Sequence, residues 1–221
     1  MTDRPVPEGW TTRERLLPVG APTFVDEQVL ANACDAIADE IDSYDSCDPA
    51  TSAKYRAFVF SYDSEAWRLA NASSLYSCAL TGGAVCDCFG AEGAGADSAY
   101  AKRNGRAVTD LKQLGVDMGA WLSKGDPHAS SSIILVGDNT AAHGAEHVII
   151  WTGRQWVEGG QLSKHGKGYR ISKAVYETEA RADGVWMRRT SPNPNGWRKV
   201  MGWIDLSLCL WTQRATLPEG A

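Results

Sequence analysis

Apolar residues in the first half of the chain recur every three or four positions. This spacing appears over residues 24–42, from Tyr76 onward, over 107–114 and, more briefly, over 118–122. It predicts amphipathic helices in these places. Residues 54–70 are compatible with helix or strand, and the part around "SEAWRLA" favours a helix.

The pattern changes in the second half of the chain, where short runs rich in β-branched and aromatic residues alternate with turn residues. Five such runs read as strands: "SSSIILVGDNT", "HVIIW", "RQWVEGG", "GVWMRRT" and "KVMGWIDLSL". Helices therefore come first and an antiparallel meander follows. That order is typical of an α+β fold.

Composition and charge narrow the class of protein. A formal net charge of −5 over 221 residues argues against nucleic acid as a partner. The first residues, "MTDRPVPEGW", lack the apolar core of a secretory signal, and no apolar run is long enough to span a membrane. We therefore expect a protein made in the cytoplasm that has no membrane partner.

Six cysteines are too few for a disulfide scaffold at this length. The sequence contains no CxxC pair of the kind that binds a metal. We expect neither a metal nor another cofactor. Among the six, only Cys78, in "LYSCALTGG", lies at a predicted helix start. A helix N-terminus lowers the pKa of a thiol because its N–H groups and dipole favour an anion. Cys78 is therefore the candidate nucleophile.

A histidine that could activate this thiol opens the run "HVIIW". The following "TGRQ" suits a two-residue type II′ turn with Gly153 first. In that register Glu158 lies on the same face as His147 and diagonal to it, within reach of its ring. Gln161 is the alternative third residue if "EGG" contains a bulge.

The order of these features resembles the papain-like NlpC-type and CHAP-type cysteine hydrolases. A helix-start cysteine, "IILVGDN", "EHVIIWTG" and "WVEGGQ" carry the resemblance, over residues 70–162. The resemblance implies a papain-like α+β fold, with N-terminal helices packed on a central antiparallel sheet and the nucleophile at a helix N-terminus. It implies a catalytic domain over 51–215, preceded by an extension over 1–50 that carries the acidic amphipathic helix.

Carried over residue by residue, Cys78 is the nucleophile, His147 the general base and Glu158 the residue that orients the base. The family's Asp-Cys-Ser-Gly is replaced here by "SCAL". The family's upstream tyrosine, an oxyanion or substrate contact, has two candidates in Tyr62 and Tyr76.

The resemblance implies a hydrolase that cleaves peptide or amide bonds in bacterial peptidoglycan or its muropeptides. Endopeptidase, amidase, deamidase and transferase chemistry all remain open. Without a secretory signal, such an enzyme would suit an exported antibacterial effector or a lysin acting in the periplasm or cell wall. An immunity protein or a component of a secretion apparatus would then be its protein partner.

Two other functions compete with this interpretation. "HGAEH", residues 143–147, matches the HxxEH pattern of inverted zincins and would give a zinc metallohydrolase. That chemistry needs both histidines on one helix face, whereas the β-branched run that follows favours a strand. Nine tryptophans could instead form a non-catalytic cell-wall-binding surface.

Overall fold

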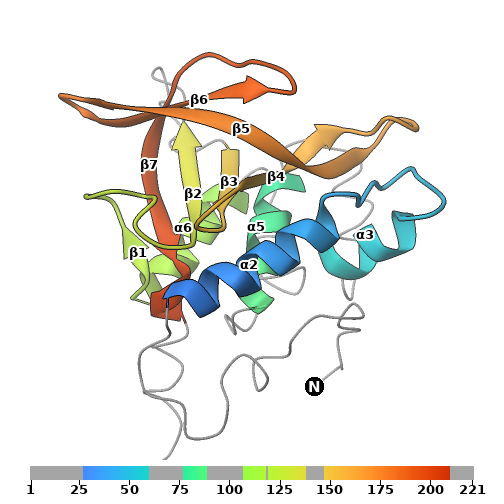
Figure 1. Cartoon of the computed structure of the whole chain (residues 1–221), viewed down its shortest axis with the longest axis horizontal. Coiled ribbons are helices and arrows are strands. Elements are labelled where there is room, and N and C mark those ends of the chain that lie inside the picture. The colour runs from blue at the N-terminus through green and yellow to red at the C-terminus, as the bar shows by residue number, and fades with distance from the viewer. Residues whose placement is uncertain (1–26, 60–76, 89–106, 118, 138–146, 210–221) are drawn as a thin grey trace, which may run out of the picture.

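Six antiparallel strands close into a barrel at the centre of the structure (Figure 1). The computed structural model describes residues 27–59, 77–88, 107–117, 119–137 and 147–209. The barrel strands are β2 (Ser132–Gly137), β3 (His147–Trp151), β4 (Trp156–Leu162), β5 (Tyr169–Arg181), β6 (Gly184–Ser191) and β7 (Arg198–Asp205). From β2 to β6, each strand pairs with the next one in the chain, and β7 pairs with β2. A pairing of β6 with β7, through Trp186↔Lys199 and Met187↔Arg198, closes the barrel. The short strand β1 (Trp121–Leu122) pairs with the other end of β7.

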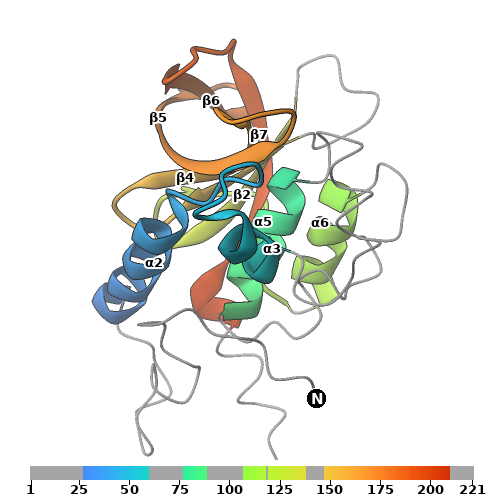
Figure 2. The ribbon, with the colours of Figure 1, turned by 90° about the vertical axis from the view of Figure 1, so that its right-hand side faces the viewer.

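This closed barrel contradicts the papain-like α+β fold, with helices packed on a central sheet, that the sequence led us to expect. The main reason is β5, a strand of 13 residues that the apolar pattern did not identify. Its second half is largely exposed because it runs with β6 beyond the barrel body, so it lacks the alternation that marks a half-buried strand. Figure 2 shows β5 and β6 curving round until β6 reaches β7.

Two groups of apolar side chains lie on the two faces of the barrel wall. One group fills the interior: Ile134, Val136, Ile149, Met187 and Trp203, with Leu122, Trp151, Trp156, Tyr176 and Val200 packed against them. The other lies outside the wall, beneath the helices, and includes Ile133, Leu135, Val148 and Ile150. Strand β2 is therefore buried along its whole length, which explains its continuous apolar sequence.

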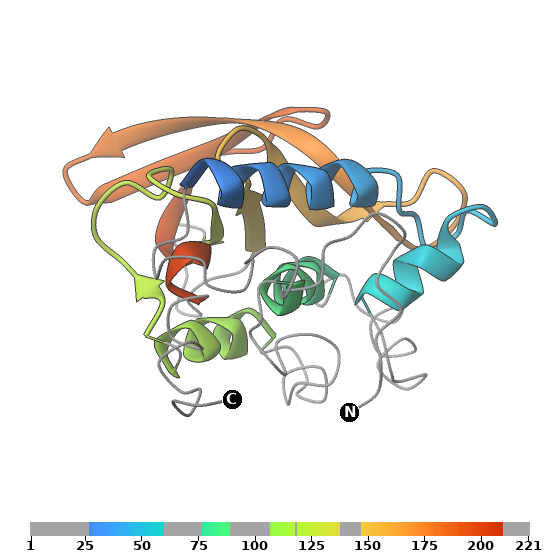
Figure 3. The same ribbon diagram turned by 60° about the horizontal axis from the view of Figure 1, so that its bottom comes forward.

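The described helices gather on one side of the barrel (Figures 2 and 3). They are α2 (Glu27–Ile41), α3 (Ser52–Val59), α5 (Ser77–Cys88) and α6 (Ala107–Asp117). The helices expected near 24–42 and 107–114 are confirmed over the described residues. The helix expected at 118–122 is wrong, because residues 121–122 form β1. "SEAWRLA" lies outside the described residues.

Helix α2 is joined to the barrel by both its apolar and its acidic side chains. Its buried residues are part of the same apolar cluster as those of α5 and the outer barrel wall. Asp35 accepts hydrogen bonds from Thr152 (2.5 Å) and Arg154 (3.0 Å) in the β3–β4 turn, and Asp39 pairs with Lys173 of β5 (2.7 Å). Asp35 and Asp39 of this acidic helix therefore have partners on the barrel. The domain boundary at residue 50 remains a prediction.

If α2 contributes to the core, truncating its buried face should destabilise the whole protein. We predict that Ile41→Ala, at a side chain only 1% exposed, costs about 2–4 kcal/mol of unfolding free energy in a denaturant titration. Val29→Ala on the same helix is the control, because Val29 is 43% exposed and should cost less than about 0.5 kcal/mol. Equal, small effects of both substitutions would show that α2 folds independently of the barrel.

Candidate functional site

Helix α5 brings a cysteine to the rim of the barrel because it lies unusually close to the strands. Its described side chains from Cys78 to Cys86 are all buried, as expected for a helix that is apolar on every side. A Cβ on Gly82 would lie 2.7 Å from Val148 and 3.2 Å from Ile133, so only glycine permits this approach without a shift. The close packing sets the N-terminal turn of α5 against the start of β3.

Cys78 is the second residue of α5 and is 4% exposed. Its thiol is within hydrogen-bonding distance of the His147 ring, and the backbone N–H groups of Val148 and Ala79 point to the sulfur. Burial raises the pKa of a thiol, but the charge and hydrogen bond of His147 and the two N–H groups outweigh it. The pKa of Cys78 is therefore lowered from its usual value of 9.0.

His147 opens β3 and is held by a carboxylate on the next strand. Its Nε2 lies 2.7 Å from Oε2 of Glu158, which leaves Nδ1 as the ring nitrogen toward Cys78. The predicted hairpin register is confirmed: Trp151 pairs with Trp156 and Ile150 with Val157. Gly153 has a φ of 99°, which favours glycine at this turn position.

A bulge in β4 adds a second polar side chain to the same place. The β4–β5 register shifts by one residue between Glu158 and Gln161, and Gly160 adopts a φ of 86°. The extra residue allows both side chains to reach the barrel end, as a bulge in "EGG" would require. The Gln161 amide donates to Oε1 of Glu158 at 2.7 Å, so it contacts the carboxylate rather than the imidazole in the described geometry.

Two further residues bind the Glu158 carboxylate from β5 and β6. The Tyr176 hydroxyl donates to Oε2 at 2.5 Å, and Nη2 of Arg189 forms an ion pair with Oε1 at 2.8 Å. Nη1 of Arg189 also donates to Gln161 at 2.7 Å. Glu158 is 1% exposed, yet three hydrogen bonds and an ion pair compensate its negative charge.

These contacts set the charges of the site. Burial would raise the pKa of Glu158, but its bonds to His147 and Tyr176 and the charge of Arg189 hold that pKa below its usual value. Burial would lower the pKa of His147, but Cys78 and then Glu158 raise it to about 9. Near neutral pH the arrangement therefore favours an imidazolium between a thiolate and a carboxylate. Burial and the Glu158 charge raise the pKa of Tyr176, so its hydroxyl remains a donor.

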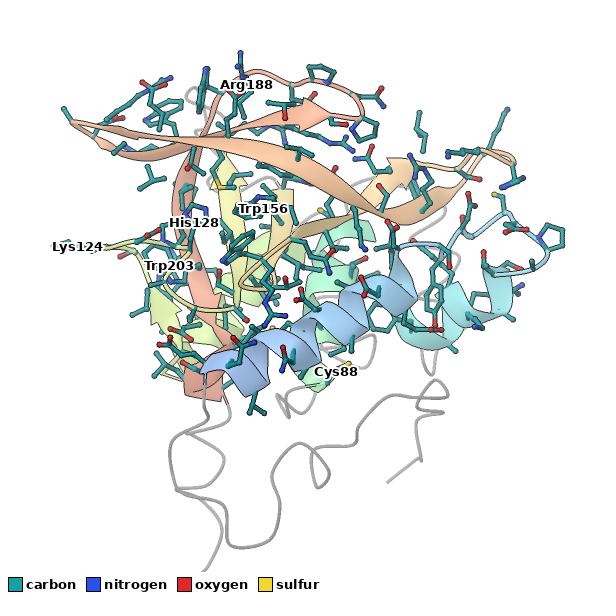
Figure 4. The ribbon with its side chains drawn as sticks, viewed as in Figure 1. Cys88, Lys124, His128, Trp156, Arg188 and Trp203 are labelled. Carbon is teal, nitrogen blue, oxygen red and sulfur yellow. The ribbon has the colours of Figure 1, made fainter. Side chains whose placement is uncertain are left out.

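A small pocket opens beside His147 at the same end of the barrel. Its cavity volume is about 10 Å³, within about 220 Å³ of empty space that includes open solvent, and Arg189, Arg198 and Asn195 are among its lining residues. His147 keeps 17% of its side chain exposed, so the pocket gives access to the imidazole. The opposite end of the barrel is filled by Trp151 and Trp156, whose ring centroids are 4.4 Å apart; Figure 4 shows Trp156 within the barrel.

The structure thus brings together Cys78, His147, Glu158 and Gln161, and it adds two residues that the sequence did not identify. Tyr176 and Arg189 are a directly paired couple on β5 and β6. No local motif marks them, and only the alternation along an identified β5 could have placed Tyr176 inside. The predicted contacts Tyr62 and Tyr76 lie outside the described residues.

The described residues bear on the HxxEH zinc motif and on membrane-spanning helices. Of the HxxEH segment, residues 143–146 lie outside the described part, and His147 begins a strand. Across the described ranges, no three His, Cys, Asp or Glu side chains are grouped in a way that could hold a metal ion. None of the helices in those ranges has both the length and the apolarity to cross a bilayer.

Comparison of the chain with protein-family models, with curated proteins and with solved structures finds no match in any of the three. Arguments about its function therefore depend on the residues and the geometry described above.

The lowered pKa of Cys78 leads to a labelling prediction. With limiting iodoacetamide at neutral pH, Cys78 should react at least about tenfold faster than Cys34 and Cys209, whose pKa values burial raises to about 12. Peptide mass spectrometry would give the rate at each cysteine. His147→Gln should slow the labelling of Cys78 alone. Faster labelling of Cys34 or Cys209, or a Cys78 rate that ignores His147→Gln, would contradict the assignment.

Proposed function

We propose that the protein is a cysteine hydrolase that cleaves peptide or amide bonds, with Cys78 as nucleophile and His147 as general acid and base. The observation that carries the proposal is the His147–Glu158 contact of 2.7 Å, next to a helix-start thiol whose pKa is lowered. A nucleophile, a base and a residue that orients the base are the components of a catalytic triad. Their placement does not require the papain-like sheet that the structure lacks.

In the proposed reaction, the Cys78 thiolate attacks the carbonyl carbon of the scissile amide and forms a tetrahedral intermediate. The His147 imidazolium then gives its proton to the leaving nitrogen, the C–N bond breaks, and a thioester remains on Cys78. Neutral His147 next takes a proton from water, which attacks the thioester and releases the acid. Glu158 keeps the imidazole oriented through both steps and stabilises its cationic form.

Bacterial peptidoglycan is the substrate that we propose, with its peptide stems as the part that is cleaved. The resemblance of "EHVIIWTG" and "WVEGGQ" to NlpC-type and CHAP-type hydrolases supports this choice. Endopeptidase, amidase, deamidase and transferase activities share the same first step, and the fragments formed would distinguish them. Action in the periplasm or cell wall, as an exported effector or a lysin, is part of this proposal.

The competing zinc hydrolase is less compatible with the geometry. HxxEH chemistry uses two histidines one helical turn apart, whereas His147 lies at the first position of a strand and its Nε2 contacts Glu158. A binding surface built on tryptophans is also poorly supported in the barrel, where Trp151, Trp156 and Trp203 belong to the interior group.

The direct test is incubation of purified peptidoglycan with the protein, followed by mass spectrometry of the soluble fragments. We expect new fragments with wild type and a loss on the order of 10³-fold or more with Cys78→Ala. Cys47→Ala is the matched control, because it removes a half-buried thiol distant in sequence from the site and should retain full activity. A chelator should have no effect if the thiol carries the reaction.

The fragments identify the bond as well. A new terminus within the peptide stem indicates an endopeptidase, release of the whole stem from the sugar indicates an amidase, and ammonia without a new terminus indicates a deamidase. Full activity of Cys78→Ala, or wild type that leaves peptidoglycan unchanged, would contradict the proposed function.

A further inference from the structure

Two arginines line the pocket beside His147, and they differ in what they contact. Arg189 is 3% exposed and is engaged by Glu158 and Gln161. Arg198 is half-buried at the start of β7, where its backbone pairs with β6, and among the described residues its guanidinium group has neither a hydrogen bond nor an ion pair. A guanidinium group that lines a pocket without an acceptor is available to a ligand.

The fold holds Arg198 in this place. It pairs directly with Met187 of β6, so the two side chains lie on the same face of the barrel wall, toward the interior. The guanidinium groups of Arg181 and Arg188 lie over the ring of the preceding Trp197, 5.1 and 5.2 Å from its centroid. Figure 4 shows Arg188 beside β6 at the top of the view, and Arg188 is not among the residues that line the pocket. The start of β7 is therefore anchored on its outer side while Arg198 lines the pocket.

The charged groups around the pocket include one more positive group than negative groups, and that group is Arg198. The Glu158 carboxylate is offset by Arg189, and a Cys78 thiolate is offset by the His147 imidazolium. Arg198 adds a positive charge that nothing in this set neutralises. Val136, Ile149 and Met187 add apolar lining to the same pocket.

We propose that this pocket is a subsite for a carboxylate of the substrate and that Arg198 is its counter-ion. Guanidinium groups bind carboxylates with two parallel hydrogen bonds, which gives orientation as well as affinity. The inference rests on the proposed hydrolase function and deepens it: the substrate is a peptide that carries a free carboxylate close to the scissile amide. Arg198 is in this respect a specificity-determining residue that touches substrate.

The experiment compares two forms of the same substrate: soluble peptidoglycan fragments with free carboxyl groups, and the same fragments after conversion of the carboxyl groups to carboxamides. For wild type, kcat/KM should be higher on the free-carboxyl form. Arg198→Gln should lower kcat/KM on that form by about 10- to 100-fold, mainly through KM, and should change the carboxamide form less than about threefold. Arg198→Lys should restore part of the preference.

Lys199→Gln is the matched control. It removes a positive charge from the next residue of β7, whose side chain pairs with Asp183 at 3.0 Å instead of lining the pocket. It should leave both rates unchanged. Activity on the carboxamide form also shows that Arg198→Gln is folded. Equal losses on both forms, or no loss on either, would overturn the subsite.

A binding measurement separates this inference from the proposed function. Calorimetry of the two fragment preparations with Cys78→Ala protein needs no turnover. Binding that requires both free carboxyl groups and Arg198 would support the subsite even if wild type cleaved nothing, in which case the hydrolase proposal alone fails. Binding that does not depend on either feature, or no binding of the free-carboxyl fragments, would overturn the subsite.

Discussion

Glu158 places a carboxylate inside the barrel wall, at a position where only 1% of its surface meets solvent. An unpaired charge in such a place would cost several kcal/mol, so its partners decide whether the arrangement is stable. Those partners come from β3, β4, β5 and β6: His147, Gln161, Tyr176 and Arg189. Arg189 is positioned by the pairing of β6 with β5, and β6 is in turn fixed to β7. The buried charge of Glu158 is therefore compensated only when the barrel strands are paired as they are here.

The charge states of His147 and Cys78 depend on that carboxylate. Glu158 favours the charged form of His147, and a charged His147 favours the thiolate of Cys78. Helix α5 must approach the barrel closely for the Cys78 thiol to reach His147. Gly82, which packs against Val148 without a side chain, permits this approach. At the aromatic end of the barrel, His128, Trp151 and Trp156 pack edge to face or tilted at centroid distances of 4.4–5.6 Å.

Local signals in the sequence are enough to predict that Cys78, His147 and Glu158 lie together, and not to predict the architecture around them. The helix start identified Cys78, and the two-residue turn at Gly153 set the register that directs Glu158 toward His147. Nothing local predicted barrel closure, because β5 is buried only over part of its length and its outer half reads as a polar segment. Tyr176 lies on this unidentified strand, and Arg189, although it lies in the run "GVWMRRT" that predicts β6, meets Glu158 only once β6 is paired with β5. The sequence leaves Gln161 as an alternative to Glu158, and the bulge at Gly160 makes it a partner of Glu158 instead.

Titration of the Cys78 thiolate tests most directly whether the buried carboxylate sustains a thiolate–imidazolium pair. The ultraviolet absorbance of the thiolate, taken as wild type minus Cys78→Ala, should already be present near neutral pH, below the usual pKa of 9.0. Glu158→Gln removes the charge that favours the imidazolium, so the signal should move to higher pH; Glu179→Gln, at an exposed carboxylate of β5, should not move it. A wild-type signal that first appears at or above pH 9, or one that is the same in Glu158→Gln, would contradict the account.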